Sequence, residues 1–129
     1  MSSVVRPGGE VLLFMAEYSV ARARLHREEL LAQYFNPVEA AELRGRHPQS
    51  TAGALAVKHA LCQLLGRLCP ECSFTERDLV LTHDAQGALR LRQIIGEAAI
   101  APEQLAVSLT HTRGRALGLA AFQEPDGVP

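Results

Sequence analysis

The sequence has 129 residues, a formal net charge of −1, 47% hydrophobic residues and 21% charged residues. A chain of this length forms one domain around one core, and this composition argues against disordered, collagen-like and coiled-coil architectures. We therefore expect a single domain over residues 1–129. Its ordered core is expected at about 11–122, with flexible ends at 1–10 and 124–129.

The near-neutral charge provides no general attraction to nucleic acid or to a membrane surface. Aromatic residues, which stack on bases, make up only 5%, and Trp is absent. No apolar run reaches the roughly 18 residues that a membrane span needs, and the N-terminal segment lacks a signal-peptide pattern. We expect a cytoplasmic protein that binds neither nucleic acid nor membrane.

In chain order, the hydrophobic pattern first predicts a buried strand at 11–15. A helix at about 19–35 follows, with Ser19 as its N-cap. Asn36-Pro37 ends this helix and begins a second one at about 38–44. After a turn, a long helix is expected from Ser50 or Thr51 to about Leu65 or Leu68, and its many alanines predict burial on several sides.

Strands at 78–82 and 88–92 flank a glycine-containing turn, a pattern that predicts a hairpin. A short helix is expected at 94–99, before strands at 105–109 and 116–122. Helices that are segregated in sequence from strands predict an α+β domain. We expect a mostly antiparallel sheet with the helices packed on one side.

Lys58 is the only lysine in the chain, and it lies beside His59 in the long helix. Arginine does not readily lose its proton, so Lys58 is the single side-chain candidate for a reaction that needs a neutral amine. We expect Lys58 to hold a phosphate or to act in proton transfer. The alternative is an ordinary solvated helix residue.

Polar side chains gather at the end of the strand that begins near Leu105. Ser108, Thr110 and Thr112 point to one side of the strand and His111 to the other. Hydroxyl groups and an imidazole at a strand end suit an anion such as a phosphate, and nearby arginines favour this interpretation. The alternative is a polar approach to a turn.

The three cysteines, an odd number, are a poor basis for a disulfide framework. Cys69 and Cys72 form a Cys-x-x-Cys pair without the βαβ context that a thioredoxin-like site requires. Together with His59 and Cys62 they could provide a tetrahedral zinc site. Free thiols are the favoured alternative.

Three arginines, Arg22, Arg24 and Arg27, lie within one predicted helix. Such a group is usually a solvated face, and its functional alternative is a docking surface for an acidic partner.

Several segments match a known family in order and spacing. The segment Leu55-Ala56-Val57-Lys58-His59-Ala60 corresponds to a helix that reads Phe-Ala-Ala-Lys-Glu-Ala in that family. The further matching segments are Tyr34-Phe35-Asn36-Pro37-Val38-Glu39, Phe74-Thr75-Glu76-Arg77-Asp78-Leu79, Asp84-Ala85-Gln86-Gly87-Ala88-Leu89 and Ser108-Leu109-Thr110-His111-Thr112. From about 11 to 122 the chain therefore resembles the small phosphopantetheinyl transferases of the holo-acyl-carrier-protein synthase type.

The resemblance implies a transfer of 4'-phosphopantetheine from coenzyme A to a serine of an acyl carrier protein, with a divalent metal, usually Mg2+. It also implies a homotrimer with sites between subunits. Arg22, Arg24 and Arg27 would meet the acidic carrier protein. The residues that would bind coenzyme A are Lys58, Ser108, Thr110, His111 and Thr112.

The chain departs from the family where the metal should bind. The family's metal-binding glutamate is replaced by His59, and its first-strand aspartate falls on Ala16, with Glu17 one residue away. Glu17 and His59 are therefore the metal ligands that we expect, and Lys58 and His59 are the catalytic candidates. Because Mg2+ prefers hard oxygen ligands, the alternative function is a catalytically impaired or inactive homologue that binds coenzyme A or the carrier protein.

Overall fold

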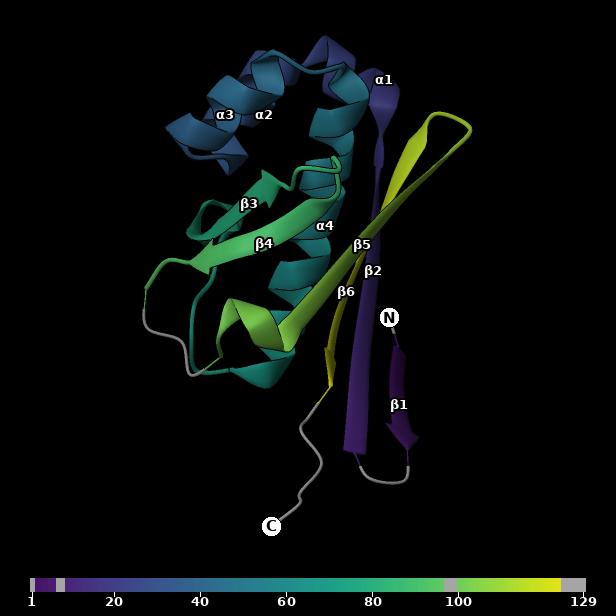
Figure 1. Ribbon diagram of the computed structural model, residues 1–129, viewed down its shortest axis with the longest axis vertical. Helices are drawn as coiled ribbons and strands as arrows, with labels where there is room; N and C mark the ends of the chain where they lie inside the picture. Colours follow the sequence, from purple (N-terminus) through teal and green to yellow (C-terminus); the bar gives the residue numbers. More distant parts are fainter. Residues whose placement is uncertain (1, 7–8, 97–99, 124–129) are drawn as a thin grey trace.

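The longest element of the computed structural model is helix α4 (Pro48–Leu68), which lies at the centre of the fold (Figure 1). The structure describes residues 2–6, 9–96 and 100–123. A four-stranded sheet packs on one side of α4, and shorter helices and a hairpin pack on others (Figure 1). The helix is mostly buried between Thr51 and Leu65 because its sequence is rich in alanine and leucine, and this agrees with the predicted burial on several sides.

The four-stranded sheet is antiparallel and has the order β1-β2-β6-β5. Its strands are β1 (Ser2–Arg6), β2 (Gly9–Ser19), β5 (Leu105–Thr112) and β6 (Arg115–Gln123). Alternation along β2 turns Leu12 and Phe14 into the core and Met15, which is 51% exposed, to the opposite side. We call that opposite side, which faces away from α4, the outer face of the sheet.

Strand β6 runs close against α4 because its core-facing residues are small. Ala116 and Ala120 are fully buried. Between them lies Gly118, where an added β-carbon would come closer than 3.0 Å to the backbone of Ala56 and Val57. The glycine therefore sets the distance between the sheet and the central helix.

The segment expected as one helix at 19–35 is two helices, α1 (Val20–Leu25) and α2 (Arg27–Tyr34), separated at His26. Leu25, the last residue of α1, is 75% exposed. Ser19 caps α1 as predicted, accepting from the backbone N–H of Arg22. The expectation of a continuous helix was wrong because the backbone of His26 departs from helical geometry.

Helix α3 (Pro37–Arg44) follows immediately, and the prediction that Asn36-Pro37 would begin a new helix is confirmed. Asn36 and Glu39 form a capping box, in which each side chain accepts from the other residue's backbone N–H over 3.0 Å. The backbone therefore holds Glu39 at a fixed place in the first turn of α3.

The predicted hairpin consists of β3 (Leu79–His83) and β4 (Leu89–Ile94) and is a separate two-stranded sheet. Asp84 organises its turn and accepts from the backbone N–H groups of Ala88 and Gln86. These two bonds hold the pKa of Asp84 below its ordinary value, and the bond from Ala88 contributes most. Two 3-10 turns, η1 (Glu76–Asp78) and η2 (Pro102–Gln104), precede β3 and β5.

The α+β class is confirmed, with helices on one face of an antiparallel sheet, but two details differ from the expectation. Residues 2–6, expected to belong to a flexible end, form strand β1 and pair with β2. Ile94 ends β4, so it does not begin the helix expected at 94–99, of which 97–99 lie outside the described residues. The C-terminal segment expected to be flexible also lies outside them.

Within the described part of the chain, the helices are too short or too polar to cross a bilayer. The cytoplasmic location predicted from the sequence stays a prediction.

Candidate functional site

His59 lies at the centre of a half-buried cluster on the side of α4. Its Nδ1 donates to Glu76 Oε2 of η1 over 2.8 Å, and 29% of its side chain is exposed. The ring of Tyr34 meets the imidazole edge-on with centroids 5.7 Å apart, and that of Tyr18 lies 6.3 Å away. We call these four residues the His59 cluster. A carboxylate that accepts from one imidazole nitrogen leaves the other as a base.

Lys58, the neighbouring residue, points into the core instead. Its side chain has no exposed surface, and Nζ donates to Glu39 Oε1 over 2.6 Å and to the carbonyl of Tyr34 over 3.0 Å. The ammonium group also lies 4.4 Å from the centre of the Phe35 ring. Burial lowers the pKa of Lys58, and the Glu39 carboxylate opposes this effect. The phosphate-binding role expected for Lys58 does not fit this position.

Glu17 and His59, the two expected metal ligands, lie on opposite sides of the sheet. Glu17 is on the outer face of β2, where Oε1 pairs with Arg115 Nη1 at 3.2 Å. Its neighbour Ala16 turns toward the core and carries no ligand. The expected metal pair is therefore not assembled, because adjacent strand residues point in opposite directions.

The donors that remain do not fit Mg2+. The His59 cluster offers one carboxylate, from Glu76, and an imidazole that is already bonded to it. Mg2+ prefers hard oxygen ligands in octahedral geometry, and nitrogen ligands favour transition metals. We derive no step of a reaction through a metal at this cluster.

At the end of β5, Ser108, Thr110 and Thr112 share one side of the strand as predicted, and they are exposed on the outer face. His111 points to the other side, where Nε2 lies 3.4 Å from the carbonyl of Gln49 in the first turn of α4. Lys58 is nine residues further along this helix, about 14 Å at 1.5 Å per residue. Lys58 and His111, expected in one phosphate site, are therefore apart.

The three arginines of the expected docking surface separate into two kinds. Arg22 and Arg24 are exposed on α1 beside Leu25, and the guanidinium of Arg22 lies 6.0 Å from the centre of the Tyr18 ring. Arg27 is half-buried, and its Nη2 donates to the carbonyl of Leu43 over 2.6 Å. Arg27 therefore joins α2 to the end of α3, and Arg22 and Arg24 are available to a partner.

The expected zinc ligands do not come together. Cys69 and Cys72 form a disulfide, Cys62 is free, and His59 bonds to Glu76. Among the described residues, the group of potential metal ligands that does come together consists of Cys69, Glu71 and Cys72.

No sequence pattern indicated a role for Glu76, Tyr18 or Tyr34. Glu76 lies 17 residues after His59 and belongs to one of the segments that matched the family. The tyrosines come from β2 and α2. Only the packing of these elements on α4 brings the four side chains together, so no spacing along the chain revealed the cluster.

Comparison with models of known families finds no match, and no curated protein matches the sequence. Solved structures do match. The coenzyme A complex of ACPS from Chronobacterium ammoniagenes has a TM-score of 0.69 and 17% identity, covering 89% of this chain and 97% of that one. Holo-[acyl-carrier-protein] synthase from Helicobacter pylori, also with coenzyme A, has a TM-score of 0.63 and 18% identity, with 84% and 97% covered.

Acyl carrier protein synthase from Mycobacterium tuberculosis has a TM-score of 0.62 and 22% identity, covering 88% of this chain and 96% of that one. These neighbours span nearly the whole chain at low sequence identity. The chain therefore has the fold of the holo-acyl-carrier-protein synthases.

Proposed function

We propose that this protein binds coenzyme A and transfers its 4'-phosphopantetheine to a serine of an acyl carrier protein. The observation that carries the proposal is the shared fold, which covers 84% and 89% of this chain in two neighbours described as coenzyme A complexes. The family resemblance of the sequence segments supports the same activity.

His59 is the proposed proton acceptor. Glu76 accepts from Nδ1–H and thereby fixes the tautomer in which Nε2 carries the lone pair. Nε2 takes the proton of the carrier serine as its oxygen attacks the phosphorus next to pantetheine. The bond to the second phosphate breaks, and adenosine 3',5'-bisphosphate leaves with the electron pair. Glu76 touches neither reactant and acts as a positioning residue.

The exposed end of β5 is the proposed contact for coenzyme A phosphates. Ser108, Thr110 and Thr112 offer hydroxyl donors on the outer face, and His111 lies beside the first turn of α4. Because the outer face and His59 lie on opposite sides of the sheet, these hydroxyls would contact coenzyme A bound at the His59 cluster of a neighbouring subunit. Lys58 has no part in this proposal because its ammonium is buried against Glu39.

Arg22 and Arg24 form the proposed docking surface for the acidic carrier protein, with Leu25 as an apolar contact between the charges. All three side chains are exposed on α1. Opposite charges on two partners speed association and fix their orientation.

We also propose a homotrimer. The outer face of the sheet carries apolar residues that the described helices do not cover: Leu13, Met15, Leu117, Leu119 and Ala121. An apolar strip of this kind is typical of an interface. Ser108 and Thr110 lie on the same face, so association would bring the proposed coenzyme A contacts to a subunit boundary. Sedimentation equilibrium tests this assembly, and a monomer at high concentration would contradict it.

A specific observation favours a second function, a binding module without transferase activity. Ala16 stands where the family has its first-strand aspartate, and Glu17 points to the outer face, so neither residue brings a carboxylate to the His59 cluster. Such a module would bind coenzyme A or the carrier protein and leave both unchanged.

One experiment separates the two functions. The protein is incubated with coenzyme A and an apo carrier protein, and the carrier is weighed by mass spectrometry, with calorimetry of coenzyme A binding and of carrier-protein binding in parallel. A gain of one phosphopantetheine that His59→Gln abolishes supports transfer by the proposed route. Binding without a mass gain supports the module, and absence of both binding and transfer contradicts both functions.

A further inference from the structure

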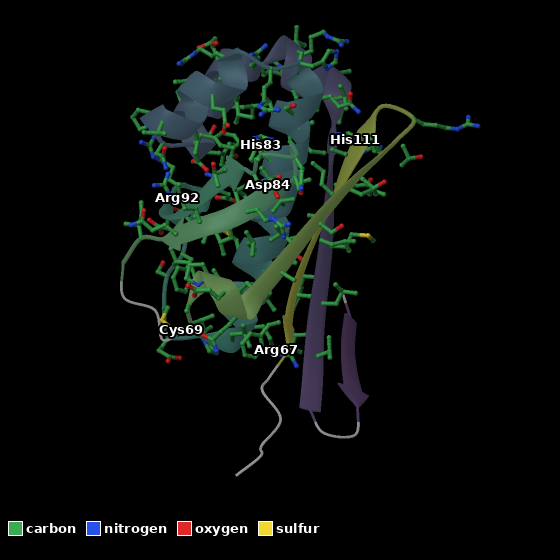
Figure 2. All side chains as sticks on the ribbon, viewed as in Figure 1. Arg67, Cys69, His83, Asp84, Arg92 and His111 are labelled. Carbon is green, nitrogen blue, oxygen red and sulfur yellow. A yellow bond between two sulfur atoms is a disulfide. The ribbon has the colours of Figure 1, made fainter. Side chains whose placement is uncertain are left out.

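We propose that Cys69 and Cys72 form a reversible dithiol–disulfide couple that exchanges with small or protein dithiols and their disulfides. The two cysteines are joined at the C-terminal end of α4, with Cα atoms 5.4 Å apart. Figure 2 shows Cys69 and Arg67 at the end of α4 opposite to His111. The proposal does not rest on the transferase function.

The loop holds the two sulfur atoms together without help from the disulfide. The backbone N–H of Cys69 donates to the carbonyl of Leu65 over 2.8 Å and ends the helix. The N–H of Cys72 donates to the carbonyl of Cys69 over 3.0 Å and closes the turn. Because these bonds are independent of the sulfur atoms, the reduced thiols stay adjacent and the disulfide can form again.

The site is accessible to a reagent. Both cysteines are half-buried, and the two residues between them, Pro70 and Glu71, are exposed. Exchange requires a thiolate to approach one sulfur in line with the other, so an exposed turn at a helix end suits the reaction better than a core position.

The surroundings disfavour the thiolate forms of the two cysteines. Glu71 Oε2 lies 3.6 Å from Cys69 Sγ, and the C-terminal end of α4 adds partial negative charge. The carboxylate and the helix end both disfavour a thiolate, most strongly at Cys69. Cysteine pairs at helix N-termini differ, because their surroundings stabilise the thiolate. A monothiol therefore reduces this disulfide poorly, and a dithiol, which completes the reaction within one molecule, reduces it well.

Each step of the exchange balances. A thiolate of the dithiol attacks Cys69 Sγ, the bond to Cys72 breaks, and Cys72 leaves as the thiolate and takes up a proton. The second thiol of the reagent then attacks the mixed disulfide. It releases the Cys69 thiol and a cyclic disulfide. The protein gains two electrons and two protons, which the reagent loses.

Cys62 takes no part in the couple. It lies seven residues before Cys69 on α4, about 10 Å along the helix. Burial raises its pKa to about 12, so it is protonated at neutral pH and is a poor nucleophile.

The couple is also separate from the His59 cluster. Glu76 follows Cys72 by four residues, but η1 has its own attachments. Arg77 donates to the carbonyl of Ala32 over 2.7 Å, and Asp78 accepts from the N–H of Thr75 over 2.9 Å. We expect reduction to change residues 69–73 and to leave the contact between Glu76 and His59 intact.

The test counts thiols by mass after alkylation in denaturant. Of the three cysteines, the protein treated with dithiothreitol should carry three labels. The protein treated with oxidised dithiothreitol should carry one label. After treatment with reduced glutathione, most chains should still carry one label. Cys62→Ser should lower each count by one and leave the equilibrium unchanged. Glu71→Gln should raise the rate of reduction by glutathione on the order of twofold to threefold, because the attacking thiolate no longer meets a carboxylate.

Three outcomes would overturn the proposal. Three labels under oxidising conditions would mean that no disulfide forms, and one label in dithiothreitol would mean that it cannot be reduced. About one zinc per chain in the reduced protein, with loss of reoxidation, would replace the couple by a metal site built on Cys69, Glu71 and Cys72. Phosphopantetheine transfer is independent of all three results.

Discussion

Lys58 Nζ and Glu39 Oε1 form a fully buried ion pair at 2.6 Å between α4 and the first turn of α3. The second carboxylate oxygen, Glu39 Oε2, accepts from the backbone N–H of Leu81 in β3 over 2.7 Å. One carboxylate therefore joins three elements, because each of its oxygens has a partner from a different part of the chain. The only lysine of the sequence serves the fold in this position.

Lys58→Met is expected to lower the free energy of unfolding by about 3–5 kcal/mol, because it leaves the Glu39 charge buried without a cation. Urea unfolding followed by circular dichroism measures the loss. The double variant Lys58→Met/Glu39→Gln removes the charge and keeps an acceptor for Leu81, so it should be more stable than Lys58→Met alone. A single variant that loses less than about 1 kcal/mol would contradict the structural role of the pair.

Gly118→Ala should be destabilising, and Gly66→Ala is its matched control. A β-carbon at Gly118 meets the α4 backbone, which cannot move aside, so we expect a loss of about 1–3 kcal/mol. Gly66 lies in the last turns of α4 with nothing within 4 Å of an added β-carbon, and alanine there should stabilise by about 0.5–1 kcal/mol. Equal changes in the free energy of unfolding at the two sites would show that the close approach of β6 to α4 does not exclude a side chain at Gly118.

Much of this fold follows from local signals in the sequence. Ser19, the Asn36-Pro37 pair and the turn at Asp84 act through neighbouring backbone groups, so their spacing predicted where helices and the hairpin begin. The break at His26 was missed because a lone deviation of the backbone leaves the helical pattern on either side intact.

The candidate site was less predictable for a physical reason. A lysine beside a histidine in a helix indicates two reactive groups, but adjacent helix residues point about 100° apart. Lys58 therefore turns into the core, and His59 turns toward Tyr34 and Glu76. Likewise, Ala16 and Glu17 point to opposite sides of β2. Strand pairing decides which of these sides faces α4, so the sequence alone did not show which of the two residues points toward the helix.

His59→Glu is predicted to create a magnesium site at the His59 cluster, whose present donors do not fit Mg2+. The new carboxylate would stand beside Glu76, and two carboxylates in contact repel each other until a divalent cation lies between them. Without metal, the melting temperature of the variant should fall below that of the natural protein. Added Mg2+ should restore it, because a ligand that binds only the folded state stabilises that state.

The natural protein is the control for this experiment, and Mg2+ should leave its melting temperature unchanged. His59→Gln carries no new charge and should respond like the natural protein. A rise with Mg2+ in the natural protein that is as large as in His59→Glu would show that the existing donors already hold the metal.

Substitution of the arginines in α1 should affect binding, whereas substitution of Arg27 in α2 should affect stability. Arg22→Glu/Arg24→Glu should weaken binding of the carrier protein and reduce its salt dependence, with little change in stability, because both side chains are exposed. Arg27→Ala removes a bond to the carbonyl of Leu43 and should cost about 1–2 kcal/mol of stability. Titration calorimetry at two salt concentrations, with thermal unfolding, separates the effects. Unchanged affinity in the double variant would remove α1 as the docking surface.

Cys62 should react slowly with iodoacetamide in the folded protein. Burial raises its pKa from 9.0 to about 12, which leaves about a thousandfold less thiolate at neutral pH, and only the thiolate is the nucleophile. The same chain in urea provides the reference rate, and a folded rate within tenfold of it would contradict the burial.

The raised pKa of Cys62 also affects stability. Because the thiol of the unfolded chain ionises first, the free energy of unfolding should fall as the pH rises above 9.0 toward 12, and Cys62→Ser should lack this part of the decline. Denaturant titrations of both proteins across this pH range measure the difference. Parallel curves would show that the thiol has the same affinity for its proton in the folded and unfolded states.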